Sequence, residues 1–126
     1  MRRVIVDTSV FVEFFTGRRV PHFESSLRNN AALLSPYVRL ELLQGVRKNE
    51  ASELGELLGG IPQVPQRDEL FPLAERMIGR LKGTGLTLGV VDLLIAAQAE
   101  LFGCLILSFD AVFRKLEKLG MARTLR

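Results

Sequence analysis

The chain has 126 residues, of which 48% are hydrophobic and 25% are charged, and its formal net charge is +3. This composition excludes a disordered chain, predicts a single domain over residues 1–126, and tolerates a polyanionic partner without requiring one. One cysteine excludes an intrachain disulfide, and the absence of a long apolar run excludes a membrane span, so we expect a cytoplasmic protein.

The first predicted element is a buried strand over residues 4–6, where apolar β-branched side chains follow one another. The next three are expected to be a helix over 10–15, a helix over 21–29 and a weak strand over 31–34. Ser35 and Pro36 then mark a helix start, because serine is a good N-cap and proline suits the first turn. We expect this helix to run to Lys48.

Helices and strands continue to alternate in the second half of the chain. The expected elements are a helix over 51–58, a short strand over 61–64, a long helix over 68–82, a buried helix over 90–102, a strand over 104–107, a helix over 111–119 and an edge strand over 122–125. Pro72 predicts either a kink in the long helix or a later start. The alternation predicts an α/β fold with a parallel sheet and helices on both faces.

Four carboxylates stand beside these elements. Asp7 and Asp110 each follow a buried strand, and the carboxyl ends of parallel strands meet at one edge, where open α/β sheets bind ligands. Asp92 begins the buried helix and heads a face of small residues that another element can approach closely. Glu41 lies at the edge of the apolar surface of its own helix, although Arg39 also falls within that apolar arc.

Each acid also has a purely structural interpretation. Asp7, Asp92 and Asp110 could cap the helices that they precede or begin. Glu41 could be a solvated helix residue, or could pair with Arg39 or Arg47. If the four converge, however, their charge needs compensation, and a hard divalent cation such as Mg²⁺ or Mn²⁺ suits several carboxylates in one cleft. Such an ion activates water and neutralises the charge that develops on a phosphodiester.

Three segments, "VIVDTSVFVEFF", "SPYVRLELLQG" and "GVVDLLIAAQAELFGCLILSFDAVF", together resemble the successive motifs of the PIN domain, in particular of VapC-type toxins. The resemblance covers nearly the whole chain. It implies a Rossmann-like α/β fold, a Mg²⁺ or Mn²⁺ site and endoribonuclease activity. Carried over by motif, the acidic quartet is Asp7, Glu41, Asp92 and Asp110. Ser9 and Ser108 match hydroxyl positions that support the first and the last acid.

The resemblance also implies partners. It suggests a homodimer, an RNA substrate, and a small antitoxin whose segment, often basic, plugs the acidic cleft. Two alternatives stay open: a stand-alone PIN-type RNA-processing nuclease, and a catalytically inactive PIN-like binding module that keeps the acids as caps. One departure from many relatives is Phe109, which is expected to make the corner around Asp110 more apolar.

Two further groups of side chains are considered. The sole histidine, His22, follows Pro21 in a predicted loop and is expected at the surface. Most basic residues are expected on solvated faces, but four near the carboxyl edge of the sheet could bind a phosphate backbone while the acids hold metal. These four are Arg18, Arg19, Arg114 and Lys115.

Overall fold

The computed structural model describes residues 1–125, and three short strands within that range form one parallel sheet. Strands β1 (Val4–Val6), β2 (Ala32–Leu33) and β3 (Leu105–Leu107) lie in the order β2-β1-β3. Val6 pairs with Leu107, so the carboxyl ends of β1 and β3 lie at the same edge of the sheet. The predicted α/β fold is confirmed.

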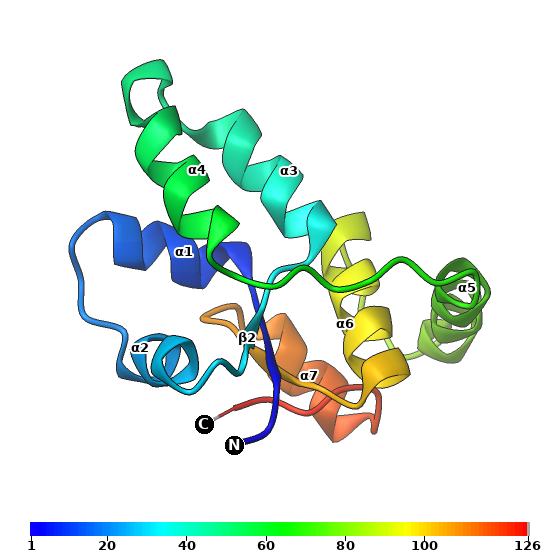
Figure 1. Cartoon of the computed structure of the whole chain (residues 1–126). Helices are drawn as coiled ribbons and strands as arrows, with labels where there is room; N and C mark the ends of the chain where they lie inside the picture. Colours follow the sequence, from blue (N-terminus) through cyan, green and yellow to red (C-terminus); the bar gives the residue numbers. More distant parts are fainter. Residues whose placement is uncertain (126) are drawn as a thin grey trace.

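Helices surround this small sheet (Figure 1). They are α1 (Thr8–Phe15), α2 (Pro21–Arg28), α3 (Pro36–Gly45), α4 (Ala51–Gly59), α5 (Leu70–Leu81), α6 (Val90–Phe102) and α7 (Val112–Lys118). Helix α6 is the central one: α5 packs against one side of it, and it also contacts α3 and β3. Residues 93–99 of α6 are buried, as its almost unbroken apolar sequence predicts. No helix among residues 1–125 is long and apolar enough to cross a membrane.

Local sequence signals explain where several helices begin and end. The Ser35 hydroxyl accepts a hydrogen bond from the Tyr37 backbone N–H, so the predicted N-cap of α3 is confirmed. Gly103 ends α6 in the left-handed conformation, with a φ of 65°, which a residue with a side chain rarely adopts. Helix α5 begins at Leu70 and not at residue 68, so Pro72 lies in its first turn. Of the two alternatives that Pro72 predicts, the later start is confirmed.

One predicted helix end and two predicted strands are wrong. Helix α3 ends at Gly45 and not at Lys48, because Val46 is extended, and Lys48–Glu50 forms a separate 3₁₀ turn. The predicted strand over 61–64 is a single bridge between Leu34 and Gln63, since Pro62 has no N–H to donate to a longer ladder. The predicted strand over 122–125 is likewise a single bridge, between Ile106 and Thr124.

Gln98 on α6 is a polar exception in the core. It is 1% exposed, and neither its amide nitrogen nor its amide oxygen has a hydrogen-bond partner in the described residues. An unpaired buried amide costs stability, so Gln98→Met, which keeps the shape, is expected to raise the free energy of unfolding by about 1 kcal/mol. Urea denaturation checks this, and a less stable variant would show that the amide is satisfied in solution.

Candidate metal centre

Asp7 joins the ends of β1 and β3. Its backbone N–H donates to the Leu107 carbonyl at 2.9 Å, and its side chain is buried, with the residue 5% exposed. Carboxylate oxygen Oδ2 accepts hydrogen bonds from the Ser9 hydroxyl at 2.8 Å and from the Ser108 hydroxyl at 2.7 Å. Asp7 occupies the N-cap position of α1 but makes no side-chain capping bond there. The interpretation of Asp7 as a helix cap is therefore wrong.

The two serine hydroxyls hold this corner together. Ser9 Oγ lies 3.3 Å from Ser108 Oγ and accepts the backbone N–H of Phe109 at 3.0 Å. Ser108 Oγ accepts the backbone N–H of Asp110 at 2.9 Å. The structure thus brings Asp7, Ser9 and Ser108 into one network, although Ser9 and Ser108 are 99 residues apart in the chain.

Asp110 has both a structural contact and an exposed position at the site. Its Oδ1 accepts the backbone N–H of Val112, the first residue of α7, at 3.0 Å, although the N-cap position of that helix is Ala111. A carboxylate has two oxygens, so this bond leaves Oδ2 able to face a cation. Phe109, next to Asp110 in the chain, is 59% exposed, so its ring adds apolar surface to this corner and is not part of the core.

Asp92, in the first turn of α6, lies within electrostatic range of the other three acids. Burial, followed by the charges of Asp7, Asp110 and Glu41, raises the pKa of Asp92 to about 6 from an ordinary 3.8. Three like charges act on one carboxyl only when they lie near it. No side chain caps the start of α6 within residues 1–125, so the interpretation of Asp92 as a cap is also wrong.

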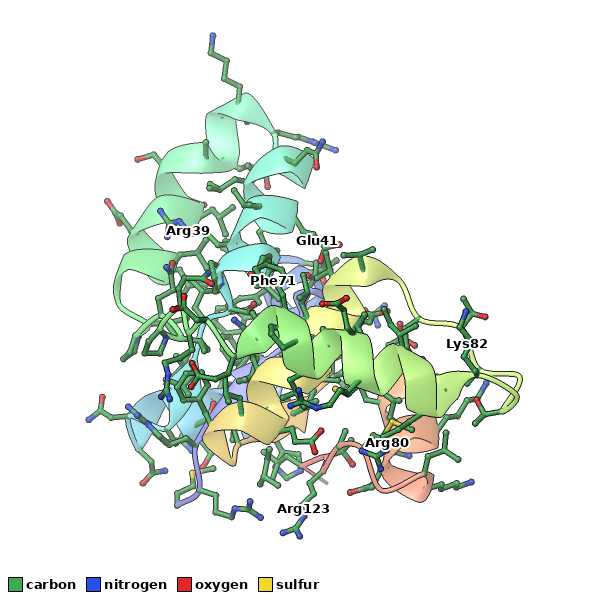
Figure 2. All side chains as sticks on the ribbon, turned by 90° about the vertical axis from the view of Figure 1, so that its right-hand side faces the viewer. Arg39, Glu41, Phe71, Arg80, Lys82 and Arg123 are labelled. Atoms are coloured by element: carbon green, nitrogen blue, oxygen red, sulfur yellow. The ribbon has the colours of Figure 1, made fainter. Side chains whose placement is uncertain are left out.

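Glu41 reaches this group from α3. Its Oε1 accepts the Thr8 hydroxyl at 2.5 Å, and Figure 2 shows Glu41 on the α6 side of α3 and Arg39 on the opposite side. Arg47 forms its ion pair with Glu50, at 3.7 Å, so the expected partners of Glu41 are both wrong. Sequence reasoning missed Thr8; the available signal was a hydroxyl directly after Asp7.

The donor set fits a hard divalent cation. All four side chains offer carboxylate oxygens, which Mg²⁺ and Mn²⁺ prefer, and none of the four has a Lys or Arg ion-pair partner in the described residues. Within residues 1–125, however, no group of three acidic, histidine or cysteine side chains is arranged so that it could hold a metal ion. The four acids thus match a hard cation in chemistry, while their side chains are not arranged as a formed metal site.

The basic residues named for phosphate binding are partly committed elsewhere. Arg18 pairs with Glu13 at 3.0 Å, and Arg19 pairs with Glu24 at 2.9 Å. These two arginines are less available for a phosphate backbone than the sequence indicates. Arg114 and Lys115 are exposed on α7 and form no ion pair within the described residues.

Known proteins resemble this chain most clearly in structure. VapBC from Salmonella typhimurium, in a DNA-bound crystal structure, matches with a TM-score of 0.80 and 17% identity over 99% of this chain and 98% of that one. VapBC2 from Rickettsia felis, bound to a promoter DNA fragment, matches with a TM-score of 0.81 and 19% identity over 97% and 96%. A toxin–antitoxin complex from Klebsiella pneumoniae matches with a TM-score of 0.70 and 17% identity over 86% and 87%.

A comparison of the sequence with curated proteins finds no significant match. The sequence profile of the PIN domain, in contrast, matches residues 4–119, which covers every strand and every acid of the candidate centre. The chain therefore belongs to the PIN domain family.

Proposed function

We propose that the chain is a metal-dependent endoribonuclease and the toxin of a toxin–antitoxin pair, acting as one domain in the cytoplasm. The observation that carries this proposal is the network at the carboxyl edge of the sheet, in which Ser9 and Ser108 hold the buried Asp7 carboxylate and Ser108 also binds the backbone of Asp110. The charges of Asp7, Asp110 and Glu41 act on Asp92, and none of the four acids has a Lys or Arg ion-pair partner in the described residues. The solved structures of the same fold that contain VapBC or another toxin–antitoxin complex add support.

In this proposal Asp7 and Asp92 hold the Mg²⁺ or Mn²⁺ ion, and Glu41 and Asp110 support them. When bound, the metal supplies an activated water and neutralises charge on the phosphodiester. Ser9 and Ser108 both donate to Oδ2 of Asp7, which fixes the orientation of that carboxylate and leaves Oδ1 as the oxygen that would bind the ion. Hydrolysis would form one P–O bond to the oxygen of water and break one P–O ester bond of the RNA backbone, leaving a phosphate on one fragment and, after proton transfer, a hydroxyl on the other.

RNA cleavage by the purified chain tests the proposal directly. Cleavage is expected with Mg²⁺ or Mn²⁺ and is expected to stop when EDTA removes the metal. A folded protein that cleaves no RNA in either metal is instead the inactive binding module. A chain that cleaves RNA but does not arrest growth when expressed is the stand-alone processing nuclease.

Metal binding is expected to stabilise the fold. The four acids repel one another in the metal-free protein, so a bound cation stabilises the folded state by mass action. Millimolar Mn²⁺ should raise the melting temperature by a few degrees, as about 1 kcal/mol does for a domain of this size. Buffer without metal and the Asp92→Asn variant serve as controls. An equal shift in the melting temperature of that variant would place the metal elsewhere.

A groove beside the acids supports the antitoxin part of the proposal. It has a volume of about 510 Å³ and lies between α1, α3 and α4, and both Thr8 and Glu41 line the end next to the site. Its wall is largely apolar, with Val12 50% exposed and Phe15 partly buried. A segment with apolar side chains followed by a basic one would fill the groove and reach the carboxylates.

A charge in this groove should separate toxicity from neutralisation. Val12→Asp is expected to arrest bacterial growth like the wild type, because Val12 is not one of the acids or their hydrogen-bond partners. The protein encoded by an adjacent short reading frame should relieve arrest by the wild type but not by Val12→Asp, since a buried unpaired carboxylate is costly. Full relief of the growth arrest caused by Val12→Asp would exclude the groove as the binding site of the antitoxin. Lys82→Asp, outside the groove, is the control.

We also propose a homodimer, as the family resemblance suggests. Apolar side chains are exposed on α5, where Phe71 is 55% and Ile78 is 41% exposed, and at the start of α6, where Val90 is 72% exposed. Such side chains provide surface that a second copy could cover. Sedimentation of the purified chain measures its oligomeric state directly, and a monomer would contradict the proposal.

A further inference from the structure

Glu41 differs from the other acids in how it is held. Asp7 is buried and bonded to two hydroxyls, and Asp110 is bonded to a backbone N–H. Glu41 is exposed on α3, and its side chain has more rotatable bonds than an aspartate. Among the described residues the Thr8 hydroxyl is the single hydrogen-bond partner of its carboxylate.

Thr8 is well placed to restrict that freedom. It is the first residue of α1, directly after Asp7, and its partly buried, β-branched side chain has few allowed rotamers. The hydrogen bond from its hydroxyl to Glu41 crosses 33 residues of sequence and joins α1 to α3, which also contact each other.

The orientation of Glu41 matters because of what lies on the two sides of α3. Glu41 lies on the α6 side of α3, and both Glu41 and Thr8 line the end of the groove of α1, α3 and α4, so without a partner the carboxylate is free to turn away from Asp92 into solvent. The hydrogen bond to Thr8 keeps Oε1 beside the residue that follows Asp7. The second oxygen, Oε2, has no hydrogen-bond partner among the described residues.

We propose that Thr8 is a positioning residue, whose hydroxyl aims the Glu41 carboxylate at the metal site; this rests on the proposed function. Thr8 acts only through Glu41. The chemical expectation is that of a hydrogen-bond partner of a metal ligand, whose loss lowers metal affinity or activity by about 10- to 100-fold. Neither Thr8 nor its contact is needed for the network of Asp7, Ser9 and Ser108.

The test compares Thr8→Val, which removes the hydroxyl and keeps the shape, with Thr8→Ser, which keeps the hydroxyl. Thr124→Val is the matched control, because Thr124 donates to the carboxylate of Glu117 at 2.9 Å. Two quantities are measured: the Mn²⁺ concentration for half-maximal RNA cleavage, and the Mn²⁺ concentration for half the shift in melting temperature. Melts in EDTA check folding.

Thr8→Val is expected to raise both Mn²⁺ concentrations about tenfold, while Thr8→Ser and Thr124→Val stay near the wild type. Glu41→Gln should reproduce the effect, and Thr8→Val added to Glu41→Gln should change nothing more. A folded Thr8→Val with wild-type metal dependence, or additive effects in the double variant, overturns the role of Thr8 alone. A wild-type chain that neither binds Mn²⁺ nor cleaves RNA overturns the proposed function and this role with it.

Discussion

Asp7→Asn and Asp92→Asn are each expected to lower RNA cleavage by more than about 100-fold, which is the upper end for removing a mere neighbour of a metal ligand. Asparagine keeps the size of the side chain and can still cap a helix. It lacks the negative charge that holds a hard cation. If the acids were only structural, the same changes would be nearly silent.

Asp68→Asn is the matched control, because Asp68 is exposed and lies outside the candidate centre. Asp110→Asn is expected to give a smaller loss that added Mn²⁺ partly restores, since Oδ1 of Asp110 is already bonded to Val112. Cleavage is measured against metal concentration, with circular dichroism melts for each variant. Full activity of folded Asp92→Asn at low metal would end the nuclease interpretation. Full activity of Asp110→Asn would show only that Asp110 is not needed, and would leave a nuclease site of the other three acids.

Below a pH of about 6, the pKa of Asp92, the Mn²⁺ needed for half-maximal cleavage is expected to rise by up to about tenfold per pH unit. A proton and the metal compete for the same carboxylate, so each pH unit below that pKa lowers the charged fraction tenfold. Rates are to be measured at several pH values and metal concentrations. A metal requirement that does not change with pH would show that Asp92 is not a ligand.

The metal-free protein is expected to show the opposite trend in stability. Between pH 3.8 and about 6, folded Asp92 keeps a proton that the unfolded chain has released, so the free energy of unfolding falls as the pH rises. Over this pH range the free energy of unfolding falls by at most about 3 kcal/mol. Solvent screening of the partly exposed side chain reduces the expected loss to about 1–2 kcal/mol. Asp92→Asn should abolish this dependence in EDTA, and Asp68→Asn should retain it.

Sequence reasoning predicted the fold where the signals were local. The Ser35 cap, the buried run of β1 and the apolar α6 each depend on neighbouring residues, and each was found. It failed where pairing decides the structure. Whether residues 122–125 form a strand depends on a partner with which they pair only once, between Ile106 and Thr124, and no local pattern encodes that.

The candidate site divides in the same way. That Asp7 and Asp110 follow neighbouring strands could be inferred from strand order alone, and the structure brings both near Asp92. The direction in which Glu41 points could not be inferred, because the helical pattern left Arg39 and Glu41 both near apolar surface. That direction depends on Thr8, a contact across 33 residues.

The hydrogen bond from Ser108 to Asp7 spans 101 residues, and it has a consequence during synthesis. A ribosome adds roughly 5–20 residues per second, so Asp7 leaves it many seconds before Ser108 does. A nascent chain that ends before Leu105 carries three of the acids but has neither β3 nor the second serine. Under the proposed function, the site therefore stays incomplete until β3, Ser108 and Asp110 have been synthesised.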